Sequence, residues 1–205
     1  MDLATTNIFI LLVVLIISIT LHETMHAFAG YWLGDDTAKQ RGRISLNPLK
    51  HVDPFGTLLL PIITLLVFHV PLLVAKPVPF NPYRVKFEEF GVALVGLAGP
   101  VTNLILAIIA AIFFRSFALS NNQLPYQFIL TFVQINVALF VFNMIPIPPL
   151  DGSRVLYAFA PEALQNVMAQ LERYGILIIF ALILAVPAFS SVLLNVDVSI
   201  LKIIL

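Results

Sequence analysis

Cysteine is absent from this chain of 205 residues, so neither a disulfide nor a thiolate metal site can form. Charge is also scarce: charged residues make up 11% of the sequence, and eleven Lys and Arg balance eleven Asp and Glu. Without a net charge or a basic run, nucleic-acid binding is not expected. Apolar residues make up 60% of the chain, a composition that excludes an ordinary water-soluble globule. The sequence therefore indicates a membrane protein.

Long apolar runs identify the candidate spanning helices, each of which needs about 20 mainly apolar residues. The first run has no basic segment before it, so we expect it to stay in the mature protein and not to be cleaved as a signal peptide. A fifth run, 56–75, is interrupted by Pro61 and Pro71 and contains His69, so it either spans or re-enters. A short interfacial helix is expected after Pro161. The four clear runs are 8–33, 90–114, 128–147 and 174–194.

Basic residues favour one topology, because short cytoplasmic loops collect Lys and Arg. If 56–75 re-enters, nine basic residues fall on one side of the membrane and two on the other; if it spans, the best division is six against five. We therefore predict a re-entrant or hairpin segment, with the N-terminus outside and the polar loops in the cytoplasm. The nine are Lys39, Arg41, Arg43, Lys50, Lys76, Arg84, Lys86, Arg154 and Arg173, and the two are Arg115 and Lys202.

One apolar run contains three costly polar groups at the spacing of a metal site. His22, Glu23 and His26 form the pattern H-E-x-x-H, and residues four apart share a helix face, so both imidazoles can reach one ion. Glu23 points about 100° away, where it can take a proton from a metal-bound water. Hydrogen-bonded core histidines beside a protonated Glu23 would be the alternative, but three such groups inside a membrane helix need a shared compensation.

A catalytic zinc site needs a third protein ligand and one open position. His51, His69 and Asp151 are the candidates. Asp151 follows a helix broken by three prolines and precedes Gly152, so a non-helical turn can aim its carboxylate inward; it could also simply cap that turn. His26 and Asp151 both lie near the C-terminal ends of their helices, so these helices must run in the same direction. Only a re-entrant 56–75 satisfies that condition, in agreement with the basic residues.

These residues resemble the site-2 protease family of intramembrane zinc metalloproteases. The resemblance covers about residues 20–155 and implies zinc bound by His22, His26 and Asp151, with Glu23 as general base. It also implies that Asn103 and Asn143 support the substrate or the reaction intermediate. The matching segments are His22-Glu23-x-x-His26-Ala27, Gly34 to Ala38, Gly42 to Pro54, Ala75 to Pro79, Ala98-Gly99-Pro100-x-x-Asn103, and Asn143 to Gly152.

The resemblance and the residues together predict an all-α polytopic membrane protein, a minimal form of that family without a PDZ or CBS domain. One metalloprotease domain would cover 1–205, with its catalytic core at about 8–155 and interfacial and spanning helices at about 161–205. A short β segment is expected near 41–47, where basic and apolar residues alternate and a substrate strand could add. The implied activity is endoproteolysis in or next to transmembrane segments of membrane proteins, with one Zn²⁺ per chain. A prokaryotic plasma membrane, with the active site toward the cytoplasm, is the expected location.

Other functions stay open at this point. A membrane metal carrier could use the same polar pocket, although its ionisable residues would extend across both leaflets, and here they cluster on one side. A catalytically inactive scaffold could bind membrane segments without cutting them. A zinc peptidase with a glutamate as third ligand would draw on Glu88 or Glu89, which precede the run 90–114 without a proline-glycine turn to present them.

Overall fold

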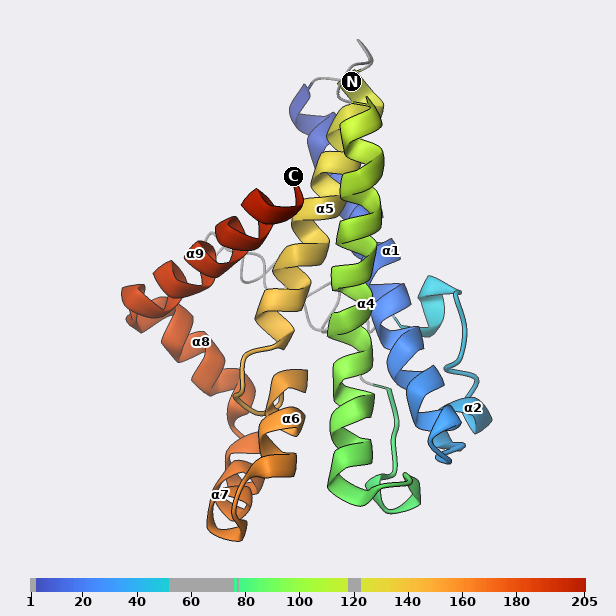
Figure 1. Cartoon of the computed structure of the whole chain (residues 1–205), viewed down its shortest axis with the longest axis vertical. Coiled ribbons are helices and arrows are strands. Elements are labelled where there is room, and N and C mark those ends of the chain that lie inside the picture. The colour runs from blue at the N-terminus through green and yellow to red at the C-terminus, as the bar shows by residue number, and fades with distance from the viewer. Residues whose placement is uncertain (1–2, 52–75, 77, 118–122) are drawn as a thin grey trace.

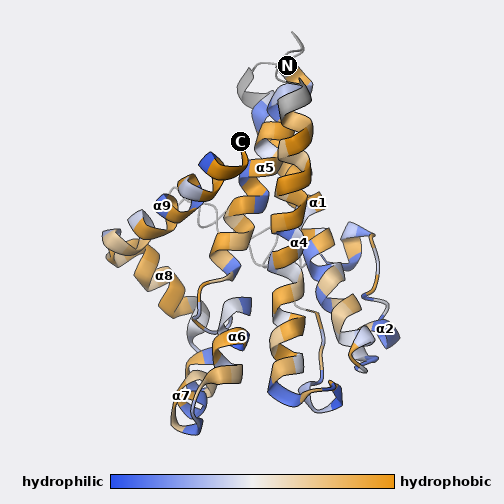
Figure 2. Ribbon diagram, in the orientation of Figure 1, coloured by the Kyte–Doolittle hydropathy of each residue, from blue (hydrophilic) through white to orange (hydrophobic). Residues whose placement is uncertain are grey.

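The computed structural model describes residues 3–51, 76, 78–117 and 123–205. Three long helices lie side by side along the long axis of the molecule: α1 (Leu3–Trp32), α4 (Glu88–Phe117) and α5 (Gln123–Asn143) (Figure 1). Their surfaces are mostly hydrophobic, and hydrophilic residues gather near α2 (Thr37–Gln40) and α7 (Glu162–Glu172) (Figure 2). The predicted all-α polytopic class is confirmed. The described helices long and apolar enough to cross a membrane are Thr6–Trp32, Glu88–Phe114, Leu124–Asn143 and Pro187–Ile204.

The direction of the long helices agrees with the predicted topology. α1 and α5 run in the same direction, and α4 runs between them in the opposite one (Figure 1). The backbone N–H of Lys86 donates to the carbonyl of Leu33 at 2.9 Å, so the chain leaves α1 and enters α4 at the same end of the bundle. The backbone N–H of Lys76 donates to the carbonyl of His51 at 3.1 Å, so these two residues also lie side by side. The predicted re-entry of 56–75, with His69, lies outside the described residues.

Gly34 ends α1 and turns the chain back toward the helices. Its φ of +110° is open to glycine and strained for other residues. Around it, the N–H of Asp35 donates to the carbonyl of Gly30 at 2.8 Å and the N–H of Gly34 donates to that of Tyr31 at 3.1 Å. This pair of bonds is the Schellman motif, which satisfies carbonyls that a helix end leaves free. The end of α1 is thus fixed about two turns beyond His26.

Small and β-branched side chains form the core between α4 and α5. Ala107, Ala111, Val133 and Val137 are at most 2% exposed, and together they allow the two backbones to approach closely. In an apolar solvent such packing stabilises a helix pair by van der Waals contact and not by water exclusion. Residues of the last helix, among them Leu193, lie against this core.

The C-terminal part differs from the predicted span at 174–194. The chain instead forms α8 (Gly175–Ala185) and α9 (Pro187–Ile204), with Val186 between them. Pro187 has no backbone N–H and disfavours a helical residue before it, so the run breaks there. The spanning candidate shifts to α9, which continues through Asn195 and Asp197 to Ile204. The short helix expected after Pro161 is present as α7.

The β segment expected near 41–47 is wrong, because the described residues there form no strand. The carbonyl of Ser45, which a neighbouring strand would need, already accepts hydrogen bonds from Thr24 Oγ1 and His51 Nε2, each at 2.7 Å. The segment is therefore held to α1 by side chains and continues into a 3₁₀ turn at Pro48–Lys50.

Candidate metal centre

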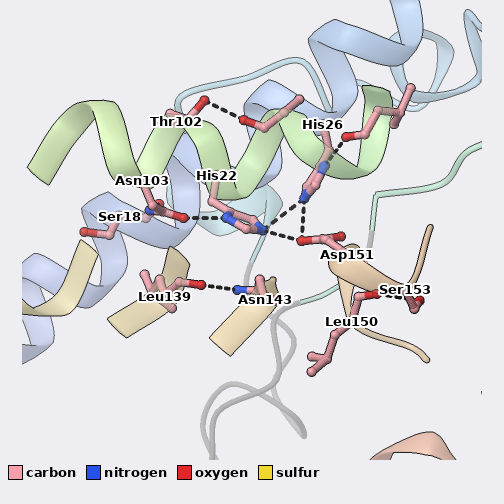
Figure 3. A network of polar contacts seen from close by, with 12 residues as sticks. Ser18, His22, His26, Thr102, Asn103, Leu139, Asn143, Leu150, Asp151 and Ser153 are labelled. Carbon is pink, nitrogen blue, oxygen red and sulfur yellow. Dashed lines mark hydrogen bonds and ion pairs between the residues drawn. The ribbon is translucent and has the colours of Figure 1, made fainter. Parts of the chain in front are cut away.

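The two histidines of the H-E-x-x-H pattern meet on the face of α1 that contacts α4. His22 and His26 are both less than 10% exposed, and their Nε2 atoms lie 3.0 Å apart (Figure 3). Their rings pack edge to face with centroids 4.6 Å apart. The spacing of four residues therefore brings both imidazole nitrogens to one point, as the sequence predicts.

Asp151 reaches the same point from another helix. It is the first residue of α6 (Asp151–Phe159), which follows the proline-containing turn after α5. Its Oδ2 lies 3.2 Å from Nε2 of His22 and 3.2 Å from Nε2 of His26 (Figure 3). Asp151 thus brings a carboxylate oxygen from α6 to the imidazole nitrogens of α1.

Gly99 allows α4 to approach the histidines. A Cβ placed there would clash with Nε2 of His26 and lie 2.6 Å from Nε2 of His22. One turn earlier, a Cβ on Gly96 would lie 3.1 Å from the carbonyl of Asp151. At Gly96 and Gly99, therefore, α4 presents backbone without a side chain to Asp151 and the two histidines. Only glycine allows the helices to approach this closely.

The outer ring nitrogens show which tautomer each histidine adopts. Nδ1 of His22 lies 2.6 Å from Oδ1 of Asn103, and Nδ1 of His26 lies 2.7 Å from the carbonyl of Val95. A carbonyl oxygen can only accept, so each Nδ1 carries a proton and each Nε2 of a neutral ring presents a lone pair. When both rings are neutral, two bare nitrogens and one carboxylate oxygen therefore converge on one point.

This donor set fits a zinc ion. A tetrahedral zinc with bonds of about 2.0 Å separates its ligand atoms by about 3.3 Å, close to the 3.0–3.2 Å found here. Converging lone pairs repel one another unless a cation lies among them. Among the described residues, His22, His26 and Asp151 form the group able to hold a metal; His51, Glu88 and Glu89 are not part of it.

A cavity of about 430 Å³ opens beside this group and contains Glu23 and Asn143 in its wall. Most of the other wall residues are apolar and come from α1, α4, α5 and α8 and from the segments at 78–80 and 149–150, and Arg154 also lies in the wall. Glu23 has no hydrogen-bond partner among the described residues, which leaves its carboxylate free to meet a water molecule. The apolar part of the wall comprises Leu15, Ile19, Val78, Phe80, Val95, Leu139, Phe142, Pro149, Leu150, Ile179, Phe180 and Ile183.

Comparisons with known proteins place the chain in a family. A family model described as "Peptidase family M50" matches residues 115–186. "Putative zinc metalloprotease YwhC" of Bacillus subtilis is 40% identical over 191 residues, an alignment that covers 89% of this chain and 83% of that protein. The chain belongs to peptidase family M50. This confirms, at the level of the family, the predicted class of zinc metalloendopeptidase and the zinc cofactor.

Mycobacterial relatives extend the comparison. "Putative zinc metalloprotease Rip2" of Mycolicibacterium smegmatis is 30% identical over 92% of this chain and 71% of its own length. A protein of the same name from Mycobacterium tuberculosis is 26% identical over 89% of this chain and 70% of its own length. No solved structure gave a significant match. The family assignment therefore rests on sequence relatives that cover most of both chains.

The two asparagines expected to support the substrate lie in different environments. Asn143 lines the cavity, and its Nδ2 donates to the carbonyl of Leu139 at 2.9 Å. Asn103 is fully buried, and its amide contacts His22 at one end and Asn136 at the other. Their expected part in the M50 reaction stays a prediction, but the amide of Asn103 is already engaged on the far side of His22.

Asn136 is a buried polar residue that the sequence reasoning missed. It lies in α5 with no exposed surface and bonds both to Asn103 and to Ser18 of α1. The signal was present in the sequence, since an amide inside an apolar run is as costly at 136 as at 103 and needs a partner. What the sequence did not contain was the rotation of α5 that brings this amide to α4.

Proposed function

We propose that this M50 protein is an intramembrane zinc endopeptidase that cuts membrane proteins in or next to their transmembrane segments. His22, His26 and Asp151 are its zinc ligands, and Glu23 is its general base. The single observation that supports this most directly is the convergence of three lone-pair atoms beside a free carboxylate, in the wall of a cavity between spanning helices. The whole chain, 1–205, would act as one membrane-embedded domain.

The bound zinc would polarise the scissile carbonyl and lower the pKa of a water molecule. Glu23 accepts a proton from the attacking water and returns a proton to the leaving amine. The outer nitrogens of both histidines hold their rings in place through carbonyl acceptors. Asn143, in the cavity wall, supports the substrate or the intermediate through its amide. We propose that Asn103 supports the imidazole of His22 and does not contact the substrate directly.

The cavity favours apolar peptide segments as substrates. Much of its wall is built from Leu, Ile, Val and Phe side chains of the apolar helices α1, α4, α5 and α8, so a transmembrane segment would exchange lipid for similar surroundings. The carbonyls of a helical substrate are occupied by its own hydrogen bonds, so the segment must unwind before hydrolysis. Such cleavage is suited to regulated proteolysis of membrane proteins.

The metal centre lies toward the end of the bundle that carries most of the basic residues. Lys39, Arg84 and Lys86 lie there, close to the ends of α1 and α4, and the positive-inside bias assigns that end to the cytoplasm. Because the chain has no cysteine, single cysteines report orientation cleanly. An impermeant maleimide applied to intact cells should label Lys202→Cys and spare Lys39→Cys, and the reverse pattern would overturn this orientation.

The function is tested by metal content and cleavage measured on the same detergent-purified samples. Wild type should hold about one zinc per chain and cut a purified single-span substrate. Glu23→Gln should retain zinc and lose cleavage by at least about a hundredfold, because the general base is removed and the ligands are intact. Asp151→Asn and His22→Ala should lose zinc and cleavage together.

Two results would contradict this function. Full turnover in Glu23→Gln would remove Glu23 from the mechanism. Stoichiometric zinc in wild type without cleavage of any membrane substrate would favour a metal carrier or a scaffold instead.

A further inference from the structure

Buried side chains of three helices form a continuous line of hydrogen bonds that ends at the metal centre. Figure 3 shows its last contact, between Asn103 and His22. Nδ2 of Asn136 donates to the carbonyl of Phe132 at 2.8 Å and to Oγ of Ser18 at 2.9 Å. Nδ2 of Asn103 donates to Oδ1 of Asn136 at 2.8 Å, and Oδ1 of Asn103 meets Nδ1 of His22 at 2.6 Å. Ser18, Asn103 and Asn136 have no exposed surface.

The line has a direction, and one backbone group sets it. The carbonyl of Phe132 can only accept, so the group of Asn136 that faces it must be the NH₂. The other end of that amide is then an oxygen, which requires the NH₂ of Asn103. The remaining oxygen of Asn103 in turn requires a proton on Nδ1 of His22. In each amide, the NH₂ donates to the previous group and the oxygen accepts from the next one.

We propose that Asn136 is a positioning residue for His22. By fixing which end of the Asn103 amide faces the imidazole, it keeps the proton on Nδ1 and the lone pair of Nε2 toward the metal. The inference rests on the proposed function to the extent that His22 is a zinc ligand.

His22 needs this second residue because its partner can rotate. An asparagine amide turned by 180° exchanges an acceptor for a donor, and a turned Asn103 would favour the tautomer whose Nε2 carries the proton. With Asn136 in place, that rotation brings two carbonyl oxygens together and breaks a buried hydrogen bond. His26 needs no such device, because its acceptor is the backbone carbonyl of Val95, which cannot rotate.

The experiment measures zinc affinity by competition with a chelator of known affinity, on intact detergent-purified protein. Asn136→Leu keeps a similar volume and removes both hydrogen-bonding ends, and it should bind zinc about 10- to 100-fold more weakly than wild type. The added change Asn103→Asp should restore most of the affinity, because a carboxylate offers an oxygen to His22 in either rotation.

Thr102→Val is the matched control. Thr102 lies beside Asn103 on α4, and its hydroxyl donates to the carbonyl of Ala98 on the same helix, so its loss should leave zinc affinity unchanged. The visible absorption of the Co²⁺-substituted protein gives a second readout: it should change in Asn136→Leu and return in the double variant. A role limited to helix packing would lower thermal stability in Asn136→Leu without a rescue of metal affinity by Asn103→Asp.

The outcomes separate this inference from the function on which it rests. Unchanged zinc affinity in Asn136→Leu, or no recovery in the double variant, overturns the positioning role and leaves the zinc site intact. Retention of zinc by His22→Ala overturns the ligand set itself. Where Asn136→Leu does not yield folded protein, Asn136→Ala with and without Asn103→Asp is compared by the same two criteria.

Discussion

The helices of the N-terminal two thirds and those of the C-terminal third treat polar groups differently. α1, α4 and α5 bury Ser18, Thr20, Thr24, two histidines and two asparagines, and all of these except the two threonines lie in the network around the metal centre. In the described parts of α7, α8 and α9, no polar residue is buried as a whole, and the one buried side-chain oxygen recorded there without a hydrogen-bond partner is Oδ1 of Asp197.

That contrast indicates that the two groups of helices have different functions. The first group of helices holds reacting groups in fixed positions, which requires close packing and complete hydrogen bonding. The second group borders the cavity through α8 and covers the core through α9, contacts that are apolar and less demanding. We therefore expect substitutions in the first group to affect zinc and stability, and those in the second to affect the substrate.

The largest effect is expected from Gly99→Ala. The new methyl group would occupy the space next to both Nε2 atoms, so one imidazole must move away from the metal position. Zinc affinity should fall by at least about a hundredfold and cleavage should be lost, as measured by chelator competition and substrate turnover. Gly30→Ala is the control, because a Cβ there meets no atom within 4 Å. Normal zinc binding by Gly99→Ala would show that α4 does not shape the site.

Packing of the core gives the next largest effect. Val137→Ala removes two methyl groups from a site with no exposed surface and should lower the free energy of unfolding by about 2 kcal/mol. Thermal unfolding in detergent should record a fall of roughly 4–8 °C. Val192→Ala on α9, where the side chain is 59% exposed, should change the midpoint very little. Equal shifts in the two variants would remove the distinction between the helix groups.

A substitution in α8 should change substrate binding without changing the metal. Phe180 lies in the cavity wall, and Phe180→Ala should raise KM for an apolar substrate by about tenfold with zinc content unchanged. Leu177→Ala on the same helix is the control, since that side chain is 69% exposed and lies outside the wall. Loss of zinc in Phe180→Ala would mean that α8 belongs to the metal-binding group of helices after all.

The smallest effect concerns Asp35, at the end of α1. Burial raises the pKa of this carboxyl, but donors from Asn81 and Thr37 and the charge of Arg84 lower it more, so its pKa lies below the ordinary value. A lowered pKa in the folded state stabilises the protein above the pKa of the unfolded chain, and this contribution is lost as the pH falls through the folded value. Asp35→Asn should cost about 1–2 kcal/mol at pH 7 and progressively less under acid conditions.

Thermal unfolding between pH 7 and pH 3 checks this result. Glu162→Gln, an exposed change at the start of α7, serves as the control and should follow the wild-type curve. A pH-independent difference between Asp35→Asn and wild type would show that the carboxylate charge does not contribute.

The sequence predicts the parts of the fold and site that depend on local chemistry. Helical spacing alone brings His22 and His26 together, and the proline run correctly predicts that Asp151 follows a broken helix. The first three spans follow from the length of their apolar runs. The break at Pro187 was also readable and was overlooked, because the apolar run continues across it.

Other features depend on how helices rotate against one another, and no local pattern contains that information. The pairing of Asn103 with Asn136 joins residues 33 positions apart on two helices. Likewise, the predicted strand near 41–47 was wrong because its carbonyl at Ser45 is taken by side chains of Thr24 and His51. In both cases a hydrogen-bond partner decided the outcome, and partners are properties of the tertiary structure.

The two groups that accept hydrogen bonds from the histidines are uncharged carbonyls, and this affects the electrostatic free energy of burying a metal ion. Asn103 and the backbone of Val95 are uncharged, so the two positive charges of a zinc ion would be matched by one negative charge on Asp151 and one on Glu23. The site as a whole would then be neutral, which keeps the solvation penalty of placing it among apolar helices small.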